Sequence, residues 1–286
     1  MTWWTVVLSG AGLVLIIVVL LVIFQHRLIY HPRSYSASSY DRLSGTVEVL
    51  SHKTSSGVQT VYLRRSSGDE HVGTVWIIFG GNAMLALDWI EMLDSFDGKC
   101  VAFLLVDYPG YGHSEGQSTP AAISESGISV FDTFVDTFEE GEQRPKVGIF
   151  GHSLGCAAAL QLATARQVER LILSSPFTST MDMTRLIVGR WAVPFLRHRF
   201  DNIARMREVL NRDLPPEVHI FHGSRDALIP VGMGRHLASL DVSIQFYENP
   251  PSDHNTVLDN CKNQILSRFI MEQRSESNQD DRRAKN

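Results

Sequence analysis

Apolar residues occur in two patterns along this chain. Residues 3–24 form one stretch with 18 apolar residues and no charged one, whereas the rest of the chain alternates short apolar runs with segments of helical periodicity. Residues 47–51 and 60–64 each present one apolar face, which predicts a β-hairpin. Continuous apolar runs follow, typical of strands buried on both faces of a parallel sheet: residues 74–79, 101–106, 147–150, 171–173, 218–221 and 242–247.

The segments between these runs complete the expected fold. Residues 121–138 and 154–165 have the length and periodicity of helices. Strands that alternate with helices predict an α/β fold with a mostly parallel, doubly wound sheet covered on both sides. Ligands of such folds bind outside the carboxyl ends of the strands, so the residues after each apolar run are the first candidates for function.

The N-terminal apolar stretch predicts a transmembrane anchor over residues 1–28. As a helix, residues 3–24 would extend about 33 Å, enough for a bilayer core of roughly 30 Å. A cleaved signal peptide is the alternative, but no Lys or Arg precedes the stretch and the residues that end it are bulky. Arg27, Arg33 and Arg42 follow the stretch, which favours a cytoplasmic location for the domain after it.

Composition sets further limits. We expect one α/β domain over residues 29–271 and a polar, disordered tail over residues 272–286, where four acidic and four basic residues occur. A net charge of −5 argues against general nucleic-acid binding. The three cysteines are too few and too scattered for a disulfide framework or a zinc site.

The pattern Gly-x-Ser-x-Gly occurs twice, around Ser114 and around Ser153. A nucleophile at the top of a strained turn needs a strand directly before it and a helix directly after it. Ser153 follows the run at 147–150 and precedes the helical segment 154–165, whereas Ser114 has loop-forming residues on both sides. Ser153 is therefore the predicted nucleophile.

A nucleophilic serine needs a base and an acid that orients the base. Asp226 lies in a loop after the run at 218–221, and His254 lies in a loop after the last run. This order of Ser, Asp and His predicts His254 as the base and Asp226 as the acid. The rivals are His222 for the base, and Asp253 and Asp201 for the acid.

The charge that develops on an attacked carbonyl oxygen needs backbone donors. The first expected donor is the N–H of Leu154, directly after the nucleophile. The second is the N–H of Asn82, in the loop after the run at 74–79, where Gly80 and Gly81 let the backbone approach a substrate.

With these motifs in place, the sequence resembles the α/β-hydrolase superfamily, in particular its small-capped, membrane-anchored serine hydrolases. The resemblance covers residues 29–270. It includes residues 80–82, where the family more often has His-Gly-Asn, and residues 107–112, where Arg is commoner than Pro109. Residues 176–179 resemble the start of the family's short cap, which we expect over residues 177–215.

The resemblance implies hydrolysis of carboxylic esters or thioesters, and relatives include protein depalmitoylases and serine peptidases. We therefore expect a membrane-tethered serine hydrolase without metal or cofactor, working through an acyl-enzyme. Its expected partners are an acyl substrate, such as a lipid or lipidated protein, and the membrane, with no nucleic acid. The alternatives are a catalytically silent membrane-anchored binding protein and a serine peptidase.

The expected cap is basic and aromatic. Residues 181–207 hold six arginines against Asp182 and Asp201, and Trp191, Phe195 and Phe200 lie among them. This composition predicts a membrane-facing surface that borders the Ser153 pocket. In the alternative interpretation, the arginines form local ion pairs and the aromatic rings pack inward. The arginines are Arg185, Arg190, Arg197, Arg199, Arg205 and Arg207.

Overall fold

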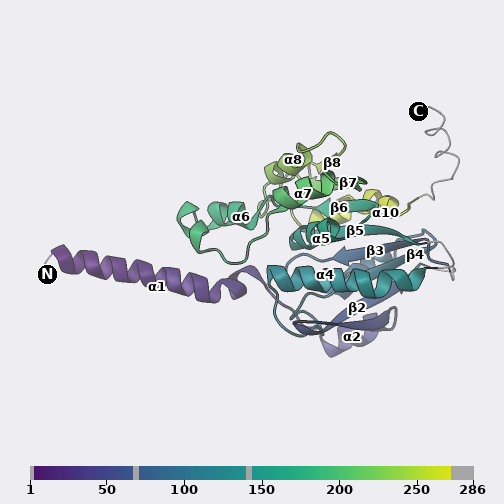
Figure 1. Cartoon of the computed structure of the whole chain (residues 1–286), viewed down its shortest axis with the longest axis horizontal. Helices are drawn as coiled ribbons and strands as arrows, with labels where there is room; N and C mark the ends of the chain where they lie inside the picture. The colour runs from purple at the N-terminus through teal and green to yellow at the C-terminus, as the bar shows by residue number, and fades with distance from the viewer. Residues whose placement is uncertain (1–2, 67–70, 140–143, 272–286) are drawn as a thin grey trace.

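The computed structural model describes residues 3–66, 71–139 and 144–271. Within these residues, an eight-stranded sheet has the order β1-β2-β4-β3-β5-β6-β7-β8, and helices lie against it (Figure 1). The strands are β1 (Glu48–Thr54), β2 (Gly57–Arg65), β3 (Thr74–Phe79), β4 (Val101–Val106), β5 (Lys146–His152), β6 (Arg170–Ser174), β7 (Glu217–Gly223) and β8 (Gln245–Asn249).

Strands β3 to β8 run parallel, while β1 and β2 form the predicted antiparallel hairpin. In the register of the sheet, Phe79 at the end of β3 lies beside Val106 of β4 and Gly151 of β5. The carboxyl ends of these strands therefore share one edge, and the mostly parallel sheet expected from the sequence is confirmed. The prediction for β8 began three residues early, because Val242 is fully exposed in the turn before the strand.

The helices cover both faces of the sheet. Alternate residues of β3 point to opposite faces: Ile77 packs with α4 and α5 on one face, and Trp76 packs against Phe269 beyond α10 on the other. The helical elements outside the cap are α1 (Trp3–Ile29), α2 (Ala37–Ser44), η1 (Ala86–Trp89), α3 (Ile90–Leu93), α4 (Pro120–Phe134), η2 (Val135–Phe138), α5 (Leu154–Ala165), α8 (Val231–Ala238), α9 (Thr256–Asn260) and α10 (Lys262–Arg268).

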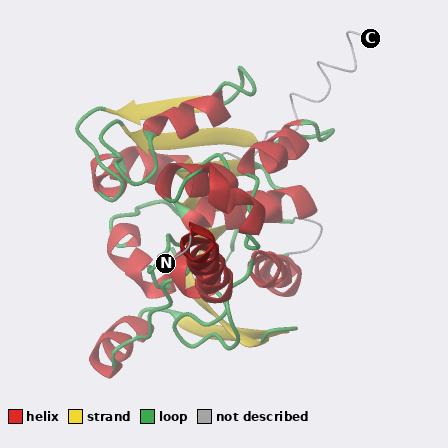
Figure 2. Ribbon diagram, turned by 90° about the vertical axis from the view of Figure 1, so that its left-hand side faces the viewer, coloured by secondary structure: helices red, strands yellow, loops and turns green. Residues whose placement is uncertain are grey.

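Helix α1 projects from the domain and points toward the viewer in Figure 2. Among the described residues, no helix combines the length and the apolarity that a membrane crossing requires. The anchor expected at residues 1–28 is thus not shown and stays a prediction. Residues 1–2, the side chains of residues 4–11, 13–15 and 17, and the tail expected over residues 272–286 lie outside the described part.

The expected cap region contains α6 (Thr180–Ile187), η3 (Arg190–Phe195) and α7 (Asn202–Leu210). Helix α6 extends from the domain on the same side as α1 (Figure 1), and η3 contacts both helices. Gln25, near the end of α1, joins the two: its Nε2 donates to the carbonyl of Phe195 at 3.0 Å, and its Oε1 accepts from the N–H of His198 at 3.2 Å. The last turns of α1 are therefore packed on the cap.

Phe200 corrects the expected cap surface. Its side chain is only 2% exposed and belongs to the core, whereas Trp191 and Phe195 are 49% and 42% exposed. The N–H of Phe200 donates to Thr180 Oγ1 at 2.9 Å, which ties its backbone to the start of α6, and its ring packs in the main hydrophobic core. Phe200 is thus a packing residue and not part of the exposed surface.

Candidate active site

Ser153 lies in a tight turn between β5 and α5. Its φ is 55°, in the left-handed region that non-glycine residues rarely adopt. Its N–H donates to the carbonyl of Ser174 at 2.8 Å, which ties the turn to β6. A Cβ at Gly155 would lie 2.3 Å from the carbonyl oxygen of Phe79, so α5 begins close to β3 only because this position is glycine. The strand, turn and helix expected around Ser153 are all present.

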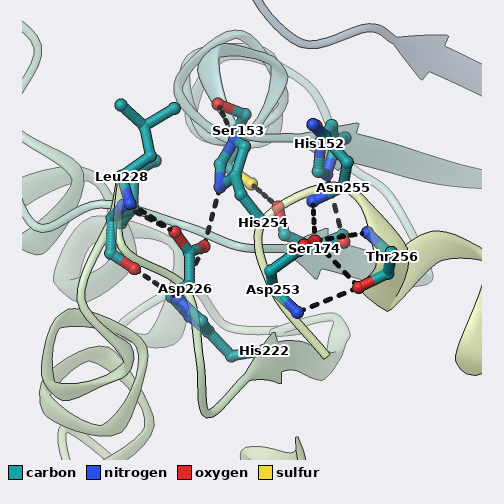
Figure 3. Close-up of polar contacts among 12 residues, drawn as sticks. His152, Ser153, Ser174, His222, Asp226, Leu228, Asp253, His254, Asn255 and Thr256 are labelled. Atoms are coloured by element: carbon teal, nitrogen blue, oxygen red, sulfur yellow. Dashed lines mark hydrogen bonds and ion pairs between the residues drawn. The ribbon is translucent and has the colours of Figure 1, made fainter. Parts of the chain in front are cut away.

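Hydrogen bonds connect Ser153 to two residues that lie far from it in the sequence (Figure 3). His254 Nε2 is 3.0 Å from Ser153 Oγ, and His254 Nδ1 is 2.7 Å from Asp226 Oδ2. Because a carboxylate only accepts, the hydrogen on the imidazole is assigned to Nδ1, which leaves Nε2 free to accept from the serine hydroxyl. The structure thus brings Ser153, His254 and Asp226 together in the order expected from the sequence.

The Asp226 carboxylate is held by several donors. Its Oδ1 accepts from the N–H groups of Leu228 at 3.0 Å and Ile229 at 2.7 Å. Burial alone would raise the pKa of this carboxyl, but the hydrogen bonds from His222, His254 and Ile229 outweigh it, so the pKa lies well below the ordinary value. Asp226 is therefore an anion whenever the fold is intact near neutral pH.

Two further histidines surround this group. His222 Nε2–H donates to the carbonyl of Ile229 at 2.9 Å and lies 3.4 Å from Asp226 Oδ2, behind the carboxylate as seen from His254. His152 lies beside the nucleophile, and its Nδ1 is 3.2 Å from Ser174 Oγ. Burial and then the neighbouring His254 lower the pKa of His152 to about 3, so its ring is neutral and adds no charge to the site.

The other rivals lie in structural positions. Ser114 Oγ accepts from the N–H of Thr60 at 2.9 Å and is 3.3 Å from the carbonyl of Asp107, so it joins a loop to β2. Asp253 accepts from backbone N–H groups of its own loop. Asp201 caps α7 by accepting from the N–H of Ala204. Among the described residues, none of these three side chains forms a hydrogen bond or ion pair with His254 or Ser153.

The two residues expected to donate to an oxyanion belong to segments that meet at Ser153, although Leu154 itself does not line the cavity. Leu154 is the first residue of α5, where an N–H has no carbonyl partner within the helix. Gly81 packs directly on the turn, since a Cβ there would lie 3.0 Å from His152 Cδ2 and 3.5 Å from Ser153 Cβ. Asn82, the next residue, lines the same cavity as Ser153.

The cavity at Ser153 has a volume of about 360 Å³. Met84, Arg225 and Leu228 were not expected from the sequence: Met84 had no motif to indicate it, whereas the other two flank Asp226 and could have been found from that position. The cap was expected to border this cavity, but no residue of 177–215 lines it, and α6 extends away from the sheet (Figure 1). The lining residues are Gly81, Asn82, Met84, His152, Ser153, Arg225, Ala227, Leu228, Asp253, His254 and Asn255.

Metal chemistry has no residues to support it in the part of the chain that is described. No three His, Cys, Asp or Glu side chains there gather in an arrangement that could hold an ion. The chemistry that the described residues offer is proton transfer between a serine, an imidazole and a carboxylate beside a cavity.

Comparison with known proteins gives the class. Residues 76–262 match the profile of the alpha/beta hydrolase family, so the chain belongs to that family. An uncharacterized protein of Mycobacterium tuberculosis is 26% identical over 220 residues, covering 75% of this chain and 74% of that protein. The alpha/beta hydrolase domain-containing protein WAV2 of Arabidopsis thaliana is 31% identical over 201 residues, covering 65% of this chain and 61% of that protein.

Among solved structures, the esterase Pf2001 of Pyrococcus furiosus superposes with a TM-score of 0.58 and covers 84% of this chain and 95% of its own. Its sequence identity is 13%, so this likeness shows the fold alone. The protein is thus a hydrolase of the alpha/beta family with esterases among its structural neighbours.

Proposed function

We propose that the protein is a serine hydrolase that cleaves carboxylic esters or thioesters of acyl substrates through an acyl-enzyme. One observation carries the proposal: His254 Nε2 lies 3.0 Å from Ser153 Oγ while Asp226 holds the opposite nitrogen of the ring. A serine bonded to an imidazole that a carboxylate orients is the arrangement that activates a hydroxyl as a nucleophile.

In the proposed reaction, Ser153 Oγ attacks the acyl carbonyl while His254 Nε2 takes the hydroxyl proton. The N–H groups of Leu154 and Asn82 stabilise the oxyanion, and Asp226 stabilises the imidazolium. The imidazolium returns its proton to the leaving alcohol or thiol, which departs and leaves an ester on Ser153. Water, deprotonated by His254, then attacks this ester and releases the carboxylic acid and the free serine.

The test is turnover of paired esters and thioesters of increasing acyl length by the full-length chain. We expect hydrolysis of both, loss of turnover in Ser153→Ala, and activity near that of the unmodified chain in Ser114→Ala, which carries the same change in the other Gly-x-Ser-x-Gly motif. Full activity in Ser153→Ala would contradict the proposal. Turnover of peptides but not esters would favour the peptidase alternative, and no turnover of any substrate would favour the silent binding protein.

We further propose that the chain is membrane-tethered, with the domain on the cytoplasmic side. The uncharged apolar sequence of residues 3–24 supports the tether, and the arginines that follow it support the side. Alkaline carbonate extraction of membranes should leave the full-length chain in the pellet and release an Ile16→Lys/Val19→Lys variant. Release of the unmodified chain would contradict the anchor.

The exposed surface of the cap fits the same proposal. Leu186, Ile187 and Val188 are exposed at the end of α6, and Trp191 and Phe195 are exposed on η3, beside the exposed apolar residues of α1. Arg190, Arg197 and Arg199 lie on η3 and the segment after it, are exposed, and form no ion pair with a described carboxylate. They would meet anionic headgroups.

This surface predicts a difference between dissolved and membrane-embedded substrates. Changing Arg190, Arg197 and Arg199 to Glu should lower turnover of an ester embedded in anionic vesicles, because the reversed charges repel the headgroups. Turnover of dissolved p-nitrophenyl acetate by the same variant is the control and should stay unchanged. Equal turnover of the vesicle-bound ester would show that the cap does not contact the membrane.

A further inference from the structure

The side chain of Asn82 is bound on both sides of its amide group by the chain that leaves α1. Its Nδ2 donates to the carbonyl of Ile29 at 2.6 Å, and its Oδ1 accepts from the N–H of His31 at 3.0 Å. The amide group therefore pairs with residues 29 and 31 in the way that one strand pairs with another. Tyr111 completes the arrangement, because its buried hydroxyl donates to Asn82 Oδ1 at 2.8 Å.

The next residue of the loop is held from the same direction. Ala83 has a φ of 62°, an unusual conformation for a residue with a side chain, which persists only when its surroundings hold it in place. Arg33 Nη1 donates to the Ala83 carbonyl at 3.0 Å and also pairs with Asp88 Oδ2 at 3.0 Å. Residues 29–33 thus contact the loop after β3 at two successive positions.

This loop carries the N–H of Asn82, which the proposed function assigns to the oxyanion hole. An oxyanion donor stabilises the transition state only if it lies at the correct position before the reaction begins. The side-chain contacts of Asn82 hold the residue that bears this N–H, and Gly81, the residue before it, packs closely against Ser153.

We propose that residues 29–33 are a structural part of the active site and position the oxyanion donor through the side chain of Asn82. Asn82, Tyr111 and Arg33 are then positioning residues. This inference rests on the proposed function but concerns a different part of the chain: it makes the segment after α1, rather than the cap, the partner of the catalytic loop. Because Gln25 joins α1 to the cap, the same helix end contacts both regions.

The test uses the full-length chain, with kcat and KM measured on p-nitrophenyl acetate. Asn82→Ala keeps the backbone N–H but loses the side-chain contacts, and we expect kcat to fall about 30-fold with KM within threefold of the unmodified chain, since losing a donor outright costs about 10²- to 10³-fold. Tyr111→Phe should lower kcat about fivefold, and the double variant should lose little beyond Asn82→Ala because both changes release the same peptide.

Three further variants separate positioning from folding. Arg33 is half-exposed, so Arg33→Ala should fold and lower kcat, whereas Arg33→Lys keeps a donor for Ala83 and should restore part of the loss. Gln59→Ala is the matched control, because Gln59 is a buried amide that donates to the carbonyls of Gly57 and Glu115 and does not line the cavity. It should lower the melting temperature and leave kcat unchanged.

The outcomes distinguish this inference from the proposed function. If the unmodified chain turns over the ester and Asn82→Ala keeps its kcat within threefold, the inference is overturned while the proposed function stands. If Gln59→Ala loses kcat as strongly as Asn82→Ala, the effect is one of general stability, and the inference is again overturned. A chain with neither turnover nor labelling by a fluorophosphonate overturns both proposals.

Discussion

Replacing Asp226 with Asn tests how the imidazole is oriented. The amide oxygen of the new side chain can still accept from the N–H groups of Leu228 and Ile229, which now bind Oδ1. The amide nitrogen would replace Oδ2, the atom 2.7 Å from His254 Nδ1. That nitrogen donates, so the imidazole must carry its hydrogen on Nε2, where it can no longer accept the proton of Ser153.

The expected loss follows from this change of tautomer. In a serine–histidine–aspartate triad of known behaviour, the same substitution lowers kcat about 10⁴-fold, which corresponds to about 5.4 kcal/mol at 1.36 kcal/mol per factor of ten. We expect a loss of this order in Asp226→Asn, with the fold intact because the backbone contacts of Oδ1 remain. Steady-state kinetics on a soluble ester and thermal unfolding measure the two effects separately.

Asp253→Asn is the matched control. Asp253 directly precedes His254, and its Oδ1 accepts from the N–H groups of Asn255 and Thr256, which an Asn side chain can also do. Turnover of Asp253→Asn should stay within about threefold of that of the unmodified chain, since the Asn side chain keeps the hydrogen bonds that hold this loop. Turnover of Asp226→Asn within tenfold of the unmodified chain, or an equal loss in Asp253→Asn, would refute the assignment of the acid.

Two other substitutions test the packing around the site. Burial raises the pKa of Asp107 from 3.8 to about 6, so the folded state holds a proton that the unfolded state has lost, and stability falls as pH rises through this window. Relative to Asp107→Asn, the free energy of unfolding in urea should therefore fall by roughly 1 kcal/mol between pH 5 and pH 7. Parallel pH profiles of the two proteins would contradict this. Gly155→Ala would place a Cβ 2.3 Å from the carbonyl oxygen of Phe79 and should lower the free energy of unfolding by roughly 3 kcal/mol. The Cβ of Gly232→Ala, the control, meets no atom within 4 Å and should not lower the melting temperature. Equal melting temperatures for the two variants would contradict the close packing at Gly155.

Much of the fold could be predicted because its evidence is local. The runs at 74–79 and 101–106 coincide with β3 and β4, since strands buried on both faces leave an uninterrupted apolar sequence. The turn at Ser153 could also be predicted, because its glycines and its flanking strand and helix are adjacent in the chain. Asp226 and His254 followed from their positions after later strands, which parallel strands bring to one edge.

The features that could not be predicted depend on contacts between distant residues. Phe200 lies among arginines and other aromatic residues in the sequence, and only its packing in the three-dimensional core shows that its side chain is buried. The side chain of Asn82 gave no sign of its contact with Ile29, which is 53 positions away. The cap contacts α1 through Gln25, which lies 170 positions before Phe195, so the sequence alone placed the cap beside a cavity that it does not line.

We propose Ser153 as the nucleophile and His254 as the base that activates it. The most direct test of this assignment is mass spectrometry of the full-length chain after treatment with a fluorophosphonate, which reacts with activated serines. We expect one adduct per chain, located on the peptide that contains Ser153, and none in His254→Ala. An adduct on Ser114 with Ser153 unmodified, or equal labelling of Ser153 in His254→Ala, would contradict it.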